Sequence, residues 1–329
     1  MSAAATNHRT VLLEGAGHYI HEDAPEGIVA AIAAWSFTLN VRQPALPALP
    51  GVEHRDVWVR GVRLHVAEAG EGPPLILLHG WPQHWWCWRH LIPRLAERFR
   101  VLAPDLRGWG WSDAPPGDYA KSAFADDVLA LLDVEGLERA RVIGHDWGGY
   151  AAFLLALSHP ERVERLVALD IPPPWRGKAH AGQLATPLFL SYQLVLATPG
   201  LGTRTLTAGN RFVRTVIRAG SGRGANWSDV ELDVYADVLR DPARAAASSA
   251  CYRTFLLREL PATLRGAHRP SELDVPTLIV MGAASPVQRV AAPQPSHNLR
   301  VERIRGAGHF LPEEAPERVL ELALSFFAG

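Results

Sequence analysis

The sequence predicts an α/β protein built on a mostly parallel, eight-stranded sheet flanked by helices. Its first sign is a series of apolar runs bounded by Gly, Pro or Asp, at residues 56–61, 64–70, 75–80, 100–106, 141–146, 165–171, 277–282 and 299–304. The runs from Leu75 onward lack polar alternation, as expected of strands buried on both faces. Helical stretches separate several of them, at roughly residues 85–98, 123–132, 149–158 and 314–327. Strand and helix in alternation are typical of a parallel sheet covered on both sides.

The domain organisation follows from where this alternation stops. Residues 176–265 carry long helical stretches and Gly-rich turns, and they separate the sixth strand from the seventh. An insert there lies over the carboxyl ends of the strands, where ligands bind in such sheets. We therefore expect a helical cap, with the sheet domain divided into residues 51–175 and 266–329. Residues 1–50 form an N-terminal extension, and residues 41–51 have the composition of a Pro-rich linker that joins the first 40 residues to the core.

The composition excludes several classes of function. Hydrophobic residues make up 48% of the 329 and charged residues 20%, which is a globular balance. A formal net charge of −1 gives no general attraction to nucleic acid or to an anionic membrane. The two cysteines, Cys87 and Cys251, form neither a disulfide framework nor a metal cluster. With no phosphate-binding loop, signal segment or apolar span either, we expect a cytoplasmic protein without cofactor, metal, nucleic-acid partner or membrane partner.

A candidate nucleophile stands between a buried strand and a helix, in Gly144-His145-Asp146-Trp147-Gly148. In this Gly-x-nucleophile-x-Gly elbow, small residues permit a tight, strained turn that lifts one side chain into the site. Here that side chain is Asp146. Upstream, another strand ends at His79-Gly80-Trp81-Pro82. The backbone N–H groups of Trp81 and Trp147 are therefore predicted to form an oxyanion hole.

These motifs, with Gly-Ala-Gly-His at residues 306–309, resemble those of the α/β-hydrolase fold. The resemblance is to its Asp-nucleophile branch, which holds epoxide hydrolases and haloalkane and haloacetate dehalogenases, and it covers residues 52–329. A carboxylate can displace at an sp3 carbon and leave an alkyl ester on the enzyme. The resemblance implies that a histidine then activates the water that hydrolyses this ester.

Two histidines compete for that role because the chain carries one segment twice. Residues 15–26 and 306–317 agree at eight of twelve positions, and each copy contains Gly-Ala-Gly-His. The base of such an elbow follows the last strand of the sheet. His309 follows the eighth predicted strand, whereas His18 precedes them all. We therefore assign His309 as the base and interpret the first copy as a duplicated fragment.

The orienting acid departs from the common pattern of the family. Many relatives carry it after the seventh strand, where this chain has Ser285. Another subset places the acid after the sixth strand, 24 residues beyond the nucleophile, and Asp170 stands 24 residues after Asp146. From a neighbouring strand end, its carboxylate can fix the tautomer of the histidine. We therefore assign Asp170.

The choice of reaction depends on two tyrosines of the cap. Opening an epoxide requires a proton donor for the ring oxygen, and tyrosine is a neutral donor at pH 7. Tyr192 and Tyr252 stand in segments similar to the two tyrosine segments of epoxide hydrolases. The resemblance therefore implies hydrolysis of an epoxide to a vicinal diol. Apolar residues of the cap, Phe189 and Leu194 among them, indicate a small hydrophobic epoxide, bound also by Trp81 and Trp147.

Other functions stay open from the sequence. In a haloalkane dehalogenase the indole of Trp147 would bind the halide, although dehalogenases with the acid at this position typically carry Asn where this chain has Trp81. A haloacetate dehalogenase would place Arg beside the nucleophile, where this chain has Trp147. Another hydrolase activity remains open. A catalytically inactive hydrolase acting as a binding protein would suit Ser285 and the duplicated fragment.

The N-terminal copy also leads to a hypothesis about assembly. If its strand and helix form as their C-terminal counterparts do, they present an apolar face that must be covered. We expect the segment to pack on the outside of the core or on a second subunit, which would support a homodimer.

Overall fold

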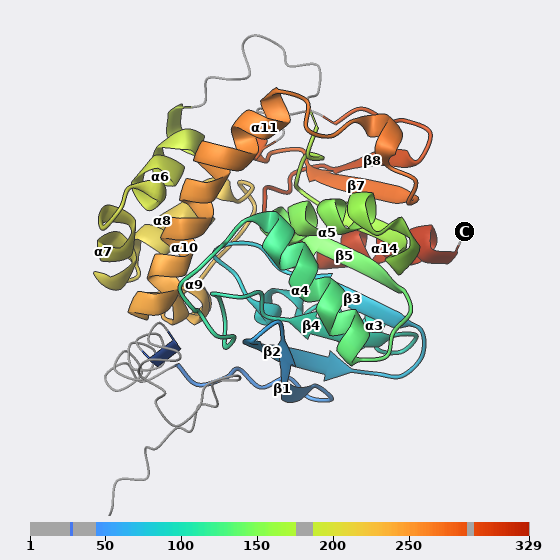
Figure 1. Cartoon of the computed structure of the whole chain (residues 1–329), viewed down its shortest axis with the longest axis horizontal. Coiled ribbons are helices and arrows are strands. Elements are labelled where there is room, and N and C mark those ends of the chain that lie inside the picture. The colour runs from blue at the N-terminus through green and yellow to red at the C-terminus, as the bar shows by residue number, and fades with distance from the viewer. Residues whose placement is uncertain (1–26, 29–43, 176–186, 288–292, 329) are drawn as a thin grey trace, which may run out of the picture. The chain divides into compact units, whose positions relative to one another are not determined.

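The protein is described here from a computed structural model of the whole chain (Figure 1). The structure describes residues 27–28, 44–175, 187–287 and 293–328, and for residues 187–190 and 270 the backbone alone. Two compact units divide the chain, residues 1–43 and residues 44–329, and the description below concerns the second. His18 and the predicted N-terminal strand therefore lie outside the described residues, as does all but residues 27 and 28 of the predicted N-terminal helix.

One eight-stranded sheet forms the centre of this unit, in the order β1-β2-β4-β3-β5-β6-β7-β8. The pairs β1·β2 and β2·β4 are antiparallel, and every other pair is parallel. The predicted sheet, eight-stranded and mostly parallel, is thus confirmed. Its strands are β1 Glu53–Val59, β2 Val62–Ala69, β3 Pro74–Leu78, β4 Arg100–Pro104, β5 Ala140–His145, β6 Val163–Leu169, β7 Thr277–Gly282 and β8 Leu299–Ile304.

The register of the parallel strands brings their carboxyl ends to one edge. Leu78 of β3 pairs with Gly144 of β5, and His145 at the end of β5 pairs with Leu169 at the end of β6. On the far side, Gly282 of β7 pairs with Ile304 of β8. Residues that directly follow these strands therefore emerge side by side, which is where the candidate catalytic residues stand.

Helices cover both faces of the sheet (Figure 1), α4 and α5 in front and α14 behind. The predicted helix over residues 85–98 is wrong as a single element. The segment forms a 3₁₀ turn and then the short α3, whose second residue, Pro93, has no N–H to continue the preceding turn. The helical elements outside the cap are η1 Trp85–Trp88, α3 Ile92–Leu95, α4 Lys121–Val134, α5 Asp146–Ser158, η2 Pro160–Arg162, η5 Pro270–Glu272, α13 Leu311–Glu314 and α14 Pro316–Ala328.

The segment between β6 and β7 is helical, as the sequence predicts for a cap. Two of its helices begin with strong local signals. Ser228 and Glu231 form a capping box at α9, and Asp241 caps α10 ahead of Pro242. The cap elements are α6 Pro187–Ala197, α7 Leu201–Thr207, α8 Arg211–Gly220, α9 Asp229–Ala236, η3 Val238–Arg240, α10 Pro242–Thr254, the π-helix η4 Phe255–Glu259 and α11 Leu260–Leu264.

The predicted Pro-rich linker is described from Pro44 onward. It forms neither helix nor strand, yet Leu46, Leu49 and Val52 pack against the hydrophobic core. The indole Nε1 of Trp111 donates a 3.2 Å hydrogen bond to the carbonyl of Pro44. This part of the linker therefore belongs to the same unit as the sheet. No helix among the described residues has the length and apolar character needed to cross a membrane.

Candidate active site

The elbow predicted around Asp146 is formed between β5 and α5. Asp146 has a φ of +50°, a left-handed conformation that costs a non-glycine residue about 1–3 kcal/mol. Glycines on both sides make the turn possible, because a Cβ on Gly144 would lie 2.6 Å from the Cα of Gly149. A Cβ on Gly148 would lie 2.3 Å from the carbonyl oxygen of Leu78. The strained turn lifts the carboxylate of Asp146 above the end of the sheet.

Two backbone N–H groups bind this carboxylate, and they are those of Trp81 and Trp147, the pair predicted to form an oxyanion hole. The N–H of Trp81, just beyond β3, donates to Oδ1 of Asp146 over 3.0 Å. The N–H of Trp147 is a second hydrogen-bond donor to the same carboxyl group. Burial raises the pKa of Asp146, but the hydrogen bond and charge of His309, with this N–H, lower it below its ordinary value. Asp146 is therefore an ionised carboxylate at neutral pH.

His309 lies between two carboxylates. Its Nδ1 is 2.7 Å from Oδ2 of Asp170, and its Nε2 is 3.5 Å from Oδ2 of Asp146. Burial lowers the pKa of His309, but the hydrogen bonds and charges of Asp146 and Asp170 outweigh burial and raise it to about 10. His309 is therefore a cation at neutral pH.

Asp170 follows β6, is fully buried and has a φ of +46°. Besides His309, it accepts hydrogen bonds from the N–H of Gly282, at 2.8 Å, and from the hydroxyl of Ser285, at 2.5 Å. Both donors belong to the end of β7 and the turn after it. Ser285, which stands where the family resemblance leads us to expect the acid, thus donates to Asp170, the residue that the sequence analysis assigns as the acid. No sequence pattern indicates this contact.

Two tyrosines of the cap lie in one aromatic cluster with Trp81 and Trp147. The rings of Trp81 and Tyr192 stack with centroids 6.0 Å apart, and Tyr252 contacts Trp81 at 5.3 Å and Trp147 at 5.7 Å. The two tyrosine rings are 5.7 Å from each other. Burial, joined by the negative charge of Asp146, raises the pKa of both Tyr192 and Tyr252. Both phenols are therefore protonated, and they are hydrogen-bonded to each other.

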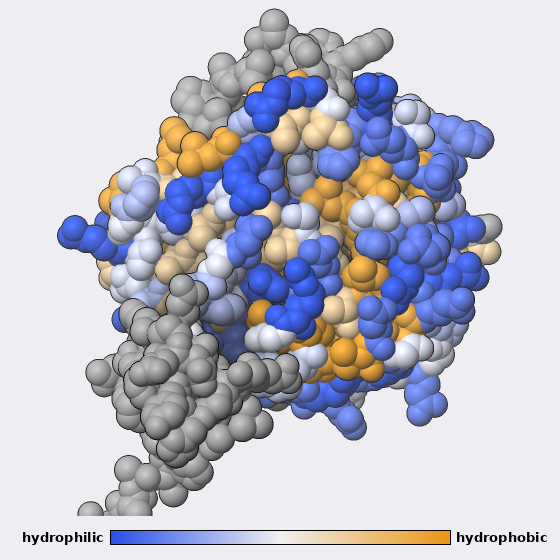
Figure 2. Space-filling view, in the orientation of Figure 1, coloured by the Kyte–Doolittle hydropathy of each residue, from blue (hydrophilic) through white to orange (hydrophobic). Residues whose placement is uncertain are grey.

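The two apolar residues predicted on α6 have different outcomes. Phe189 lies where the structure describes the backbone alone, so its side chain lies outside the described residues. Leu194 is not brought to the site, because its side chain is 59% exposed, and Figure 2 shows apolar side chains on the surface over α6. The helix turns 100° per residue, so the inward positions of Tyr192, Gln193 and Leu196 leave Leu194 facing outward.

Two further histidines and a lysine surround the site. His79 accepts from the N–H of Leu106 and contacts the carbonyl of Gly80, while Nε2 of His145 donates to the carbonyl of His309. Lys121 was missed by the sequence reasoning. Its Nζ lies 4.3 Å from the centre of the Trp147 ring, on a side chain without solvent exposure. A single lysine at the start of a helix gives no pattern from which such burial could be predicted.

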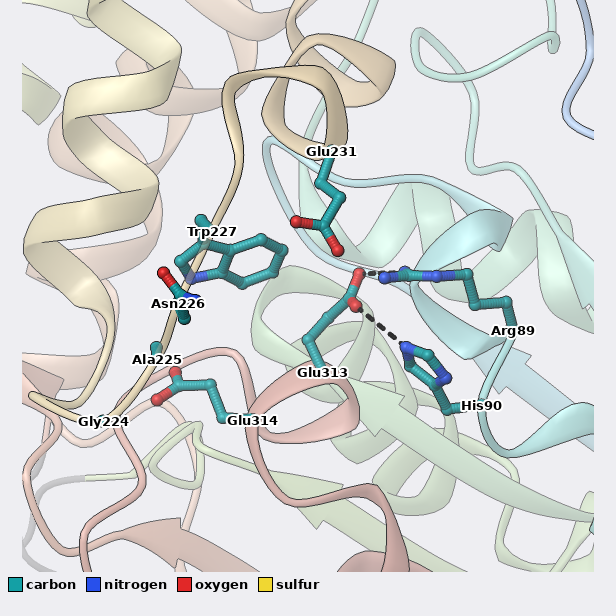
Figure 3. Close-up of a pocket in the computed structure, with 9 residues that line it drawn as sticks. All are labelled: Arg89, His90, Gly224, Ala225, Asn226, Trp227, Glu231, Glu313 and Glu314. Carbon is teal, nitrogen blue, oxygen red and sulfur yellow. Dashed lines mark hydrogen bonds and ion pairs between the residues drawn. The ribbon is translucent and has the colours of Figure 1, made fainter.

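A polar pocket of about 190 Å³ shares no residue with the predicted site (Figure 3). Its lining consists of Arg89, His90, Gly224, Ala225, Asn226, Trp227, Glu231, Glu313 and Glu314. The carboxylates have partners inside the protein: Glu313 accepts from Arg89 and Tyr235, and Glu231 belongs to the capping box of α9. Across the described residues, no group of three or more His, Cys, Asp or Glu side chains could hold a metal ion.

Comparison with known proteins places the chain in a family. The profile described as "alpha/beta hydrolase fold" matches residues 73–316. A soluble epoxide hydrolase of Corynebacterium sp. (strain C12) is 34% identical over 287 residues, which cover 84% of this chain and 98% of the relative. Epoxide hydrolase A of Mycobacterium tuberculosis is 33% identical over 316 residues, covering 84% and 97%.

A solved structure agrees with these sequence matches. The epoxide hydrolase CorEH, determined without ligand, superposes with a TM-score of 0.73 at 32% identity, over 84% of this chain and 99% of that one. The finding favours an active hydrolase over the inactive binding protein that the sequence left open. The chain belongs to the epoxide hydrolase family of α/β-hydrolase-fold enzymes.

Proposed function

We propose that the protein adds water to a hydrophobic epoxide and releases a vicinal diol, through an alkyl ester on Asp146. The observation that carries this proposal is that an anionic nucleophile and neutral proton donors lie on opposite sides of one site. An ionised Asp146 lies beside a His309–Asp170 pair on the core side, and the protonated phenols of Tyr192 and Tyr252 lie on the cap side. A nucleophile facing neutral proton donors suits the opening of a strained ether.

In the first step the Asp146 carboxylate attacks one epoxide carbon, and the C–O bond of the ring breaks. Tyr192 and Tyr252 hold the ring oxygen, and one of them transfers its proton to the forming alkoxide. Ester formation removes the negative charge of Asp146, which is one of the two charges that raise the pKa of His309. His309 then loses its proton to solvent, which balances the proton that restores the tyrosine.

In the second step neutral His309 takes a proton from water, and the hydroxide attacks the ester carbonyl carbon of Asp146. The N–H groups of Trp81 and Trp147, already bound to this carboxyl group, stabilise the oxyanion. The intermediate collapses, the leaving diol oxygen takes the proton from His309, and the carboxylic acid of Asp146 gives its proton to His309. This sequence restores the original ion pair. Asp170 stabilises the imidazolium throughout.

The substrate class follows from the walls of the site. Trp81, Trp147 and the two tyrosines surround the carboxylate with aromatic surface, and Lys121, the cation beside them, is paired with Glu259. His309, the other cation of the site, lies between Asp170 and Asp146. Both positive groups are thus paired with carboxylates, which disfavours an acidic substrate. We therefore propose an uncharged hydrophobic epoxide.

One observation favours a second candidate, a haloalkane dehalogenase. The buried Nε1 of Trp147 has no hydrogen-bond partner among the described residues, so this N–H is able to bind a halide. Both functions use Asp146 and His309, and they differ in the leaving group. The tyrosine pair supports the epoxide, because a halide leaves without a proton.

The test is intact-protein mass spectrometry of wild type and His309→Gln after brief exposure to styrene oxide, with the diol assayed in parallel. We expect diol from the wild type and, on His309→Gln, a persistent adduct with the mass of the intact epoxide, mapped to Asp146. The control, Asp146→Asn, should form no adduct. Absence of both diol and adduct would contradict the proposal, and bromide release from 1-bromobutane would then identify a dehalogenase.

A further inference from the structure

The loop that carries the base touches the cap through bare backbone. We call residues 306–310 the base loop and residues 220–222, at the end of α8, the cap loop. A Cβ on Gly222 would lie 2.1 Å from the carbonyl oxygen of Gly306, and one on Gly308 would lie 2.2 Å from the nitrogen of Gly222. Such distances leave no room for a side chain. The two loops therefore fit together only because glycine stands at both positions.

The base itself takes part in this contact. The backbone N–H of His309 donates to the carbonyl of Gly220 over 2.8 Å. Since Gly220 is the last residue of α8, the main chain of the catalytic histidine is bound to the cap, while its imidazole is bound to Asp170 of the core. The orientation of His309 thus depends on both.

One carboxylate holds the two loops together. Oε2 of Glu314 accepts hydrogen bonds from the N–H groups of Gly222, at 2.7 Å, and Gly308, at 2.8 Å. Its Oε1 accepts from the N–H of Phe310 at 2.9 Å. The backbone donors immediately before and after His309 therefore both end on Glu314, and so does one from the cap loop. Hydrogen bonds to an ionised acceptor are about twice as strong as neutral ones.

We propose that Glu314 is a positioning residue for His309. It orients the histidine by holding the base loop against the cap loop. The proposal rests on the proposed two-step function and adds a residue to it. Glu314 touches neither nucleophile nor oxyanion hole in the contacts of the described residues. Loss of the hydrogen bonds to Glu314 should therefore slow hydrolysis of the ester, the step that needs a base, more than the attack by Asp146.

The chain offers a graded set of variants. In Glu314→Gln one oxygen becomes an NH₂ donor that faces backbone N–H groups, so one or two of the three hydrogen bonds are lost. Glu314→Asp keeps both oxygens on a shorter side chain and should recover part of the function. Glu317→Gln, which removes the same charge from an exposed position three residues further on, is the matched control.

The experiment is a single turnover of styrene oxide, in which formation and decay of the covalent adduct are timed by mass spectrometry. We expect Glu314→Gln to slow the decay at least tenfold more than the formation, so that the adduct accumulates, with Glu314→Asp in between and Glu317→Gln like wild type. Equal slowing of both steps, or of neither, would overturn the proposal. If Glu314→Gln does not fold, the ratio in Glu314→Asp decides.

A second readout separates this proposal from the proposed function. If His309→Gln forms no adduct, the two-step function has failed. The positioning role of Glu314 is then tested by proton NMR of the His309–Asp170 hydrogen bond. Its downfield proton should broaden or shift in Glu314→Gln and stay unchanged in Glu317→Gln. An unchanged signal in both variants would contradict the positioning role of Glu314, whatever reaction the protein catalyses.

Discussion

At the scale of single residues, the charge on His309 is set by its two carboxylate neighbours. They raise its pKa to about 10, well above the ordinary 6.5. A histidine whose pKa is raised on folding stabilises the native state fully below pH 6.5, and this contribution is lost as pH rises through about 10. The ion pair is therefore intact at neutral pH, and in the proposed reaction it is weakened when Asp146 is alkylated.

We predict that Asp146→Asn lowers the pKa of His309, because the first of the two partners that raise it loses its charge. Asp170 remains, so the residue should still titrate above the value expected from burial alone. The measurement is a ¹⁵N histidine NMR titration of wild type and variant, with His309→Gln used to assign the signal. An unchanged pKa would show that the charge of Asp146 does not raise the pKa of His309.

Asp170 and Ser285 lie at neighbouring strand ends and meet at one oxygen, since Oδ2 of Asp170 contacts both Ser285 and His309. We predict that Asp170→Ser lowers diol turnover by roughly 10⁴-fold, the loss seen when the orienting acid of a serine protease is replaced. The exchange Asp170→Ser with Ser285→Asp should recover at least tenfold of this, because the carboxylate returns from the next strand. A double variant no better than the single one would refute the equivalence of the two positions.

At the scale of elements, the end of α10 is joined to the core through an irregular helix. The π-helix Phe255–Glu259 continues α10 and ends at Glu259, whose carboxylate binds Nζ of Lys121 at 2.5 Å and the N–H of Lys121 at 2.7 Å. The same Nζ donates to the carbonyl of Cys251 over 3.3 Å. A helix of the cap is thereby connected to the first residue of α4, beside Trp147.

We predict that Lys121→Met lowers the free energy of unfolding by about 3–5 kcal/mol, because Glu259 is left largely buried without its cation. The double variant Lys121→Met with Glu259→Gln should recover part of the loss, since the uncompensated charge is gone. Urea denaturation of the wild type and both variants measures the effect. Equal destabilisation by the single and double variants would mean that packing, rather than charge, dominates at this position.

At the scale of the whole molecule, the site is assembled from segments distant in sequence. Trp81, Asp146, Asp170 and His309 follow β3, β5, β6 and β8, and the two tyrosines come from α6 and α10. All of these residues belong to the unit formed by residues 44–329. The chemistry of the proposed reaction is therefore contained in that unit.

We predict that removal of residues 1–43 leaves diol turnover within about twofold of the full chain, because the truncated protein keeps every residue of the site and the Trp111 contact to Pro44. Light scattering of both proteins tests the dimer hypothesis at the same time. A dimeric full chain and a monomeric truncation would support it, and the same oligomeric state in both proteins would count against it. A large loss of turnover would show that the first unit contributes to the site.

The sequence by itself determined the sheet, the elbow at Asp146 and the position of the cap. These features are encoded locally: buried strands are continuous apolar runs, and the elbow requires small residues within two positions of the nucleophile. The resemblance of the motifs to a family then pointed to His309, Asp170 and the two tyrosines. Local pattern failed at residues 85–98, where an apolar, helix-like stretch is interrupted by Pro93.

Only the tertiary structure decided how the site is held. Ser285 meets Asp170 across 115 residues, Glu259 meets Lys121 across 138, and Glu314 meets Gly222 across 92. The sequence around such a serine, lysine or glutamate does not distinguish it from others in the chain. Its partner depends on the register of the sheet and on how the cap packs against the core. The exposure of Leu194 has the same origin, since the orientation of α6 on the core selects which of its apolar residues are buried.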